Sequence, residues 1–309
     1  MSNVLCKNNW ELHSMNKDNS IDGISNLISQ EVHSKDKILK PDFNQKTGRE
    51  LLAFYLQTKF KQILAYDKKA PVPVFINIKQ DFISRFSKRL INNPNRRFLI
   101  GITGESASGK STICNEIENV IKNFELPVSI ITTDNYFNDI SELISKYGGF
   151  DNLRDNGYDI DAPENFQLDI LRQDLEKIAG GEDIYCPEYL PNGTGVSVPL
   201  SKFVPSEKII VVEGMATMYD GIKDLFDIKI YIETDLDVRR KRFLTRACGE
   251  RNQDMENALK HWEYILSAGQ KYIIPSRKDM DIILNGDSSL DYFSHILEYI
   301  HTITNNFEQ

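Results

Sequence analysis

Short apolar runs alternate with stretches of helical periodicity from residue 97 onward. Runs rich in β-branched residues predict strands, and they lie at residues 98–103, 128–133, 208–212, 228–233 and 281–284. Between them, apolar residues recur at helical spacing over 168–178 and 255–266. Strands that are apolar throughout are typical of a sheet with both faces covered. The pattern therefore predicts an α/β fold, with a parallel sheet covered by helices on both faces.

The residues before 97 carry a different pattern. Apolar residues at helical spacing predict amphipathic helices over 48–65 and 78–90, separated by a segment that contains two prolines. The first 47 residues are polar and have only a weak helical pattern. We therefore expect a polar tail and helical extension over 1–96 and one larger domain over 97–309.

Charge divides the chain at the same boundary. The net charge of −8 at pH 7 combines +7 over residues 1–96 with −15 over residues 97–309. A basic extension docks more simply on its own acidic domain than on a polyanion. Because the segment also lacks the aromatic pattern of an RNA-binding surface, no nucleic-acid partner is expected.

The overall composition is that of an ordinary enzyme. Hydrophobic residues make up 40% and charged residues 27% of the chain, which is near the average of soluble domains. The four cysteines and five histidines show neither a disulfide framework nor the spacing of a zinc site. No apolar run approaches the length of a membrane span, and residues 1–10 lack the pattern of a signal peptide. We therefore expect a cytoplasmic protein without a membrane partner.

The strongest motif is GESASGKS at residues 104–111, which fits G-x-x-x-x-G-K-[ST] directly after a predicted strand. In such a loop, backbone N–H groups and the start of the following helix cradle phosphates. Lys110 supplies positive charge at the β- and γ-phosphates, and the Ser111 hydroxyl is placed to bind Mg²⁺. The residues expected to bind ATP are Gly104, Ser106, Ala107, Ser108, Gly109, Lys110, Ser111 and Thr112. Motors, GTPases and regulators use the same cradle, so the motif alone does not define a kinase.

Two carboxylates follow predicted strands. Asp134 comes after the run 128–133, and Glu213 comes after the run 208–212. Ligands of parallel sheets bind beyond the carboxyl ends of the strands. Phosphoryl transfer to an alcohol needs a proton acceptor there, which Asp134 can be, and a carboxylate that orients Mg²⁺, which Glu213 can be. The alternatives are a helix N-cap for Asp134 and a strand-terminal ion pair for Glu213.

A basic cluster lies inside the acidic domain, over residues 235–251. Its spacing predicts a helix with Arg239, Arg242 and Arg246 on one face. Such a face of guanidinium groups can close over transferring phosphates as a lid. Within this lid, Arg246 and Arg251 are the expected catalytic contributors. A solvated basic face is the alternative.

Together these residues resemble the uridine kinase and phosphoribulokinase family of P-loop kinases, over roughly residues 97–286. The resemblance rests on GESASGKST at 104–112, TDNYF at 133–137, YDIDAP at 158–163, VEG at 212–214, and Arg246 with Glu250, Arg251 and Asp254. It implies a catalytic set, a metal set and an acceptor set. In the catalytic set, Asp134 is the base, and Lys110, Arg246 and Arg251 lie on the phosphates. The metal set consists of Ser111, Asp134 and Glu213, at Mg²⁺. The acceptor set consists of Asp161, Tyr136 and Tyr189, and Asp161 binds the acceptor's hydroxyls.

The chain departs from the family's pattern where uridine and cytidine kinases read the pyrimidine. An aromatic residue and a histidine are expected after Tyr189, but Pro191 and Thr194 stand there. In the basic helix and just after it, Phe243 and Gln253 occupy positions where arginines are typical. A pyrimidine nucleoside is therefore the default acceptor of the family, and an alcohol of the sugar phosphate, pantothenate or glycerate type stays open.

The resulting hypothesis is a Mg-ATP-dependent phosphotransferase that acts on a hydroxyl of a small metabolite, similar to a uridine or cytidine kinase. Its expected partners are ATP, Mg²⁺ and a small-molecule acceptor, and assembly into a homo-oligomer stays open. The alternative from another class is an NTP-dependent regulatory or nucleic-acid-associated protein whose basic extension binds a polyanion. Acceptor-dependent turnover of ATP would distinguish the kinase from that alternative.

Overall fold

The computed structural model describes residues 73–79, 81–93, 96–115 and 128–287, together with Lys61, Leu64, Ala65, Asp67 and Lys68. The predicted polar tail and most of the helix predicted over 48–65 lie outside these residues.

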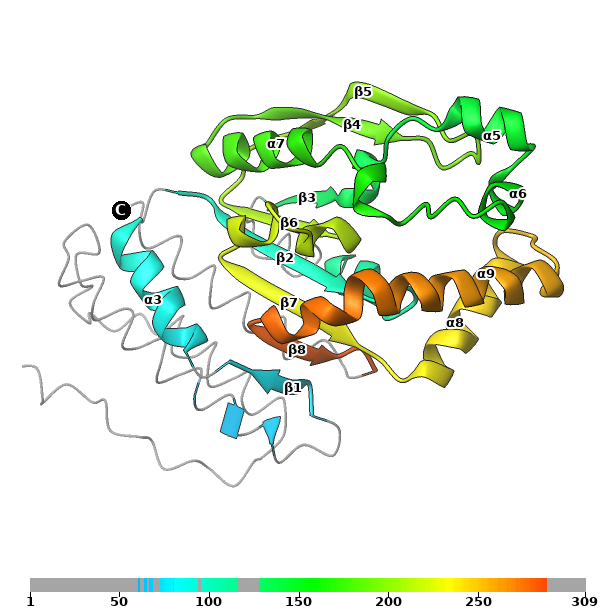
Figure 1. The fold of residues 1–309 in the computed structure, drawn as a ribbon. Helices are drawn as coiled ribbons and strands as arrows, with labels where there is room; N and C mark the ends of the chain where they lie inside the picture. Colours follow the sequence, from blue (N-terminus) through cyan, green and yellow to red (C-terminus); the bar gives the residue numbers. More distant parts are fainter. Residues whose placement is uncertain are drawn as a thin grey trace, which may run out of the picture.

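The five strands predicted from the apolar runs form a parallel sheet. A sixth strand joins it antiparallel at one edge, and the strand order is β1-β8-β7-β2-β6-β3. Their bounds are β1 Phe75–Ile78, β2 Phe98–Gly104, β3 Val128–Thr132, β6 Ile209–Glu213, β7 Ile228–Glu233 and β8 Ile282–Asn285. Every residue of β2 is buried, because this strand lies between two others and under helices. The parallel order brings the carboxyl ends of β2, β3 and β6 to one edge of the sheet (Figure 1).

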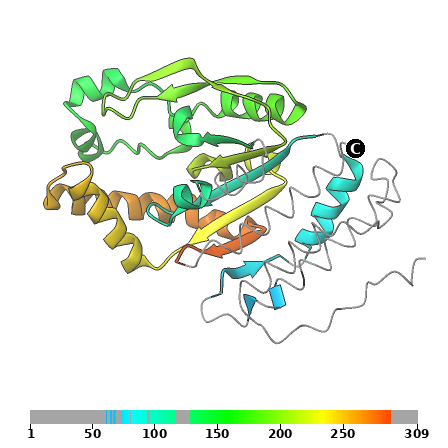
Figure 2. The same cartoon turned by 180° about the vertical axis from the view of Figure 1, so that it is seen from behind.

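The helices predicted over 168–178, 235–251 and 255–266 are also present, and the predicted α/β fold is confirmed. The longer helices are α3 Phe82–Asn92, α7 Leu168–Gly180, α8 Leu236–Gly249 and α9 Met255–Ala268, and the shorter α5 Ser141–Tyr147 and α6 Phe150–Asp155 lie near the carboxyl edge. In α7, Leu171, Leu175 and Ile178 are fully buried and join the core cluster that includes the β6 residues Ile210 and Val212. Figures 1 and 2 show α7 on the β3 side of the molecule and α8 with α9 on the β7 side.

The segment before residue 97 contributes to the same sheet. Ile78 ends β1, so the helix predicted over 78–90 is wrong in its first turn and begins instead at Phe82. The Asp67 carboxylate accepts hydrogen bonds from the backbone N–H groups of Val74 at 2.8 Å and Phe75 at 3.0 Å, which fixes the start of β1.

Arginines of this segment pair with aspartates of the larger domain. Arg89 on α3 and Arg96 each contact Asp227, with N–O distances of 2.7 and 2.9 Å. Arg85 contacts Asp281 at 2.5 Å. The described part of the basic extension thus docks on the acidic domain, in the direction that the charge division predicts.

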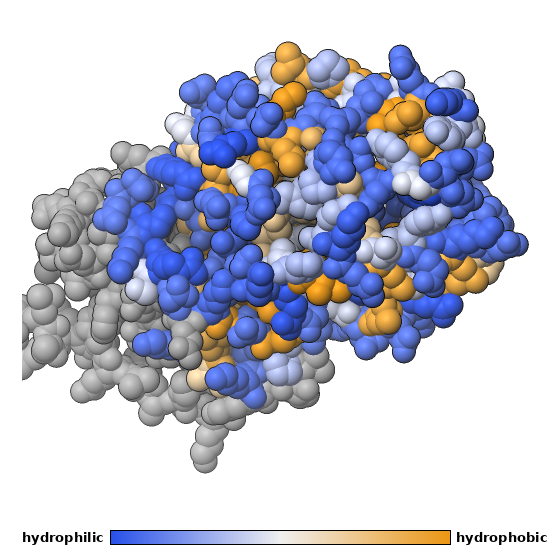
Figure 3. Space-filling model, viewed as in Figure 1, coloured by the Kyte–Doolittle hydropathy of each residue, from blue (hydrophilic) through white to orange (hydrophobic). Residues whose placement is uncertain are grey.

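A hairpin was not predicted from the sequence. Strands β4 Ile184–Tyr189 and β5 Ser197–Val204 form a separate antiparallel pair beside α7. Most of β5 is exposed, including Leu200 and Phe203. On the face shown in Figure 3, apolar side chains form separate patches on a mostly hydrophilic surface. In the described residues, no helix combines the length and hydrophobicity that a membrane span requires.

Candidate active site

Strand β2 leads directly into the phosphate-binding loop. Gly104 has φ +154°, and a Cβ there would lie 2.6 Å from the backbone oxygen of Ile232, so only glycine fits. Gly109 has φ +100°, and a helix begins at Lys110. The order of strand, loop and helix is therefore the one that the motif requires, with the helix N-terminus at the loop.

The Lys110 side chain folds back over this loop. Its Nζ donates to the backbone oxygens of Gly104 at 2.7 Å and Glu105 at 3.0 Å. Burial lowers the pKa of Lys110, and the opposite charges of Glu213 and Asp134 counteract part of that decrease. The lysine thus belongs to the same electrostatic group as the two predicted carboxylates.

A glycine allows the ends of β3 and β6 to approach closely. Gly214 follows Glu213, has φ +126°, and a Cβ there would lie 2.1 Å from the Thr133 hydroxyl oxygen. Asp134 is the next residue, in the short helical turn η1 Thr133–Tyr136. The side chain of Thr132, not that of Asp134, caps this turn by accepting from the Asp134 N–H at 3.4 Å. The alternative of a helix N-cap therefore does not hold for the Asp134 carboxylate.

Burial and the neighbouring Glu213 both make ionisation of the Asp134 carboxyl less favourable. Solvent reaches the side chain of Asp134, but the surrounding protein partly desolvates the carboxyl. This desolvation, with the negative charges of Glu213 and Asp161 and against the positive charge of Lys110, raises the pKa of Asp134 to about 6. At pH 7.5 the group is still ionised, so it can accept a proton.

The donor set at this edge suits Mg²⁺. Two carboxylates, Asp134 and Glu213, and the exposed Ser111 supply the hard oxygen ligands that this ion prefers. A cation would also relieve the repulsion that helps to raise the pKa of Asp134. Within the described residues, no group of three His, Cys, Asp or Glu side chains could hold a metal alone. A magnesium ion would therefore take its remaining ligands from phosphate oxygens and water.

The predicted acceptor residues divide between the surface and the core. Asp161 is half-buried, and burial, reinforced by Asp159 and opposed by Arg154, raises its pKa. Tyr189 ends β4, and its ring centroid lies 5.4 Å from that of Phe137. Burial raises the pKa of Tyr189 to about 12.

Tyr136 is placed differently from these two residues. It has no exposed surface, and its hydroxyl donates to Asp174 on α7 at 2.9 Å. This residue lies in the core beneath η1, where an acceptor does not reach it without rearrangement. We therefore assign Tyr136 a supporting position under the site and not direct contact with the acceptor.

The predicted lid face is wrong for Arg239. This residue is 3% exposed, pairs with Glu105 of the phosphate-binding loop at 2.8 Å, and donates to the backbone oxygen of Ser106 at 3.1 Å. Its guanidinium also lies 5.6 Å from the Trp262 ring centroid on α9. Helical spacing placed Arg239 on the face of Arg246, but the core between α8 and α9 determines which members of that face remain exposed. Arg239 therefore fastens α8 to the loop.

Three further arginines, Arg154, Arg246 and Arg251, interact electrostatically with one another or with Asp161. Arg246 and Arg251 are exposed, and partial burial together with the charges of Arg246 and Arg154 lowers the pKa of Arg251. Arg154 on α6 interacts electrostatically with Asp161 as well. No sequence motif marks Arg154, so pattern analysis missed it. Arg154 thus links the two sets electrostatically, because its charge interacts with that of Arg251 and with that of Asp161.

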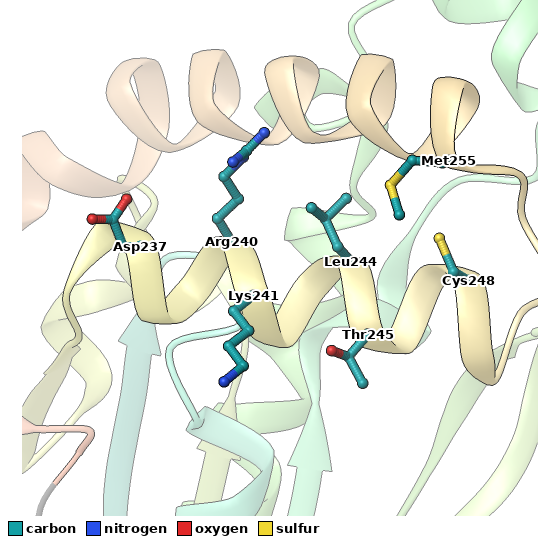
Figure 4. A pocket seen from close by; sticks show the side chains of 7 residues that line it. All are labelled: Asp237, Arg240, Lys241, Leu244, Thr245, Cys248 and Met255. Carbon is teal, nitrogen blue, oxygen red and sulfur yellow. The ribbon is translucent and has the colours of Figure 1, made fainter.

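A separate pocket of about 460 Å³ lies along α8, and Figure 4 shows its lining residues. They are Asp237, Arg240, Lys241, Leu244, Thr245, Cys248 and Met255. None of the predicted site residues is among them, so this pocket does not define the candidate active site.

A parallel sheet with a glycine-rich phosphate-binding loop after its central strand, and with carboxylates at the ends of two neighbouring strands, defines a P-loop nucleotide-binding protein. The sequence model of the Phosphoribulokinase / Uridine kinase family matches residues 99–290. Because this match covers more than half of the chain, the chain belongs to that family, and the resemblance seen in the motifs is confirmed.

Individual relatives carry uridine kinase names. Uridine kinase-like protein 5 of Arabidopsis thaliana is 28% identical over 72% of this chain and 46% of its own length. The uridine kinase of Staphylococcus epidermidis is 32% identical over 62% of this chain and 88% of its own length. The chain thus spans about half the length of the plant relative and most of the bacterial one.

Among solved structures, phosphoribulokinase from Rhodobacter spheroides is similar with a TM-score of 0.43 and 14% identity, over 62% of this chain and 70% of that chain. A similarity of this size carries no argument of its own.

Proposed function

We propose that this chain is a Mg-ATP-dependent kinase that transfers the γ-phosphoryl group of ATP to a hydroxyl of a small metabolite. The observation that carries the proposal is the meeting of Lys110, Asp134 and Glu213 at one edge of the sheet, where their charges interact. A binding module needs the phosphate-binding loop alone. A proton acceptor beside that loop is what phosphoryl transfer to an alcohol requires.

The side chains have separate roles in this reaction. The acceptor oxygen attacks the γ-phosphorus, the bond from that phosphorus to ADP breaks, and the hydroxyl proton passes to Asp134. Lys110, with Arg246 and Arg251, stabilises the negative charge of the transferring group. Ser111, Asp134 and Glu213 would hold Mg²⁺, which when bound supplies positive charge at the β- and γ-phosphates.

A pyrimidine ribonucleoside is the first acceptor to test. The named relatives are uridine kinases, and Asp161 offers a carboxylate to a pair of sugar hydroxyls. The charge of Asp161 interacts with that of Asp134. A third sugar hydroxyl, next to the two that Asp161 binds, can therefore approach Asp134, the proton acceptor. Tyr189 supplies an aromatic wall next to Phe137.

Another small alcohol is the second candidate, and one observation favours it. Thr194 stands where the family's pattern has a base-reading histidine, and its hydroxyl donates to Asn192 at 2.5 Å within the hairpin turn. A hydroxyl used in this way does not read a base edge. This leaves acceptors of the sugar phosphate, pantothenate and glycerate type in competition.

The test is ADP release by the purified chain with Mg-ATP and a panel of uridine, cytidine, sugar phosphates, pantothenate and glycerate. We expect release that depends on one acceptor class, and loss of that release in Lys110→Ala, which removes a phosphate contact without removing a core side chain. ATP turnover that is independent of every acceptor would contradict the kinase and favour a regulatory NTPase. The domain boundary at residue 96, the cytoplasmic location and the absence of a nucleic-acid partner stay predictions.

A further inference from the structure

The loop that carries Asp161 is held by residues that no motif singles out. It runs from α6 to the short turn η2 Pro163–Asn165 and passes alongside α9 (Figure 1). The Asp159 carboxylate, two residues before Asp161, accepts from Lys271 Nζ at 2.7 Å and from the Tyr272 hydroxyl at 2.7 Å. Both donors lie directly after α9, so they join the loop that carries Asp161 to the end of this helix.

The segment that carries these donors has an unusual backbone. Gly269–Ile273 is a π-helical turn between α9 and the following 3₁₀ turn. Such turns are rare and are found mostly at functional sites. A Cβ on Gly269 would lie 3.1 Å from Glu105 Oε1 in the phosphate-binding loop. The turn therefore contacts the nucleotide side at its first residue and the acceptor loop at its third and fourth residues.

The loop is also fastened next to Asp161 itself. The Tyr219 hydroxyl donates to the backbone oxygen of Asp161 at 2.7 Å, and the Tyr219 and Tyr272 rings are 6.2 Å apart. Asn165 Nδ2 donates to the backbone oxygen of Asp159 at 2.6 Å. These contacts hold the backbone of the loop. The Asp159 side chain is then the point at which the turn after α9, through Lys271 and Tyr272, can set the position of the loop.

We propose that Lys271 and Tyr272 are positioning residues for the acceptor, because their hold on Asp159 keeps Asp161 directed at the reacting hydroxyl. The inference rests on the proposed function, in which Asp161 binds the acceptor. The Asp159 and Lys271 side chains are 40% and 60% exposed. An ion pair this exposed adds little to global stability. Its effect is therefore local, on the loop, and it shows in acceptor binding before it shows in folding.

A matched contact gives the control. Tyr264 on α9 donates to Asp155 at 2.7 Å, which joins α9 to the end of α6, at a residue further from Asp161 in the sequence than Asp159 is. Tyr264→Phe and Tyr272→Phe remove the same group from the same kind of bond. The two variants differ in whether the contact lies next to the acceptor carboxylate.

The experiment compares Tyr272→Phe, Lys271→Met and Tyr264→Phe, with uridine and Mg-ATP as the probes. We expect the first two to raise the KM for uridine about three- to tenfold, the range for the loss of a typical hydrogen bond. In the same two variants, we expect kcat and the KM for ATP to change by less than about twofold and Tm by no more than a few degrees. Tyr264→Phe should match wild type in all four quantities. Lys271→Arg, which keeps the cation, should have the KM for uridine of wild type.

Amide hydrogen exchange provides a readout that needs no acceptor. The amides of residues 157–162 should exchange faster than in wild type in Tyr272→Phe and Lys271→Met. In Tyr264→Phe they should exchange at the wild-type rate. Unchanged exchange in all variants, or a KM effect no larger than that of Tyr264→Phe, overturns the inference; so does a fall in Tm and kcat with no change in the KM for uridine.

Asp161→Asn, measured in parallel, separates this inference from the proposed function. If Asp161→Asn raises the KM for uridine and the other variants do not, the positioning role alone fails. If Asp161→Asn also leaves that KM unchanged, the proposed acceptor role of Asp161 fails and the positioning role falls with it.

Discussion

At the scale of single residues, the most informative group is a carboxylate that stays accessible to solvent although protein charges surround it. Asp134 has a pKa raised to about 6, chiefly by desolvation and then by Glu213. A base with a pKa closer to the working pH returns its proton readily and still accepts one at neutral pH. The local environment of η1 thus suits proton transfer better than that of an ordinary surface aspartate.

We predict that Asp134→Asn lowers kcat by about 10²- to 10⁴-fold, the usual cost of losing a general base, while the affinity for ATP changes much less. The amide keeps the shape of the side chain and cannot take the proton. Steady-state kinetics and nucleotide binding by calorimetry check this, with Asp169→Asn on the exposed side of α7 as the control. An equal loss of ATP binding would make Asp134 mainly a metal ligand.

His261 gives a prediction for pH. It lies edge-on to Phe243 at 5.1 Å, and burial, together with the charges of Arg154 and Arg251, lowers its pKa from 6.5 to about 4. Between these values the unfolded state binds more protons than the folded state, so stability is full above pH 6.5 and falls as the pH drops toward 4. From pH 7.5 to pH 5 this contributes a loss on the order of 1–2 kcal/mol.

Denaturant unfolding at both pH values checks this prediction. His261→Gln removes the titrating group, so its loss of stability between pH 7.5 and pH 5 should be smaller than that of wild type by the same amount. If wild type and variant lose equal stability over this range, His261 does not remain neutral in the folded state.

The residues that sequence analysis placed correctly belong to local patterns. The loop from Gly104 to Ser111 is continuous in the chain, so its spacing alone specifies its geometry. Arg239 and Tyr136 were misplaced because burial is decided by distant residues: Glu105 and Trp262 enclose the first, and α7 covers the second. Arg154 was missed for the same reason, since only folding brings α6 next to Arg251 and Asp161.

At the scale of elements, α8 is joined to the phosphate-binding loop by one buried ion pair. Arg239 and Glu105 have side chains that are 3% and 15% exposed. Removing one partner of such a pair leaves the other charge buried and unpaired, which costs about 3–5 kcal/mol. The contact therefore matters more for the position of the loop than a surface pair would.

We predict that Arg239→Met destabilises the protein by an amount in that range and weakens ATP binding, because the loop loses its anchor on α8. Thermal unfolding and nucleotide titration measure the two effects. The matched control is Arg240→Met, which changes the exposed neighbour on the same helix and should leave both unchanged. Equal Tm values for the two variants would show that Arg239 is not an anchor.

Strand prediction succeeded for the five parallel strands, which carry apolar or β-branched runs, and failed for β1, β4 and β5. The strands β2 and β6 read as uninterrupted apolar runs because helices and neighbouring strands cover them. In contrast, β4 contains Pro187 and β5 is mostly exposed, so neither has a clear apolar pattern. The edge strand β1 is four residues long and follows a proline-rich segment, which hid it.

At the scale of the whole molecule, the division at residue 96 that charge indicates does not separate two independent layers. Strand β1 supplies the antiparallel edge of the main sheet, next to β8. In β8, Ile282, Ile283 and Leu284 are at most 3% exposed. Asp281, just before this strand, is buried and pairs with Arg85 of α3. The described extension therefore completes the fold that positions the site.

We predict that deleting residues 1–90 lowers Tm and causes self-association. The deletion removes β1, so β8 becomes an edge strand that offers unpaired backbone groups and apolar side chains to another chain. It also removes Arg85 and Arg89, which leaves Asp281 without its cation and Asp227 with Arg96 alone. Thermal unfolding and light scattering measure the two effects. The full-length double variant Arg85→Met/Arg89→Met separates them, because it should be less stable and yet unchanged in assembly. If the truncated chain is as stable as the full chain and assembles in the same way, the extension is only a tether, and β8 does not need a partner strand.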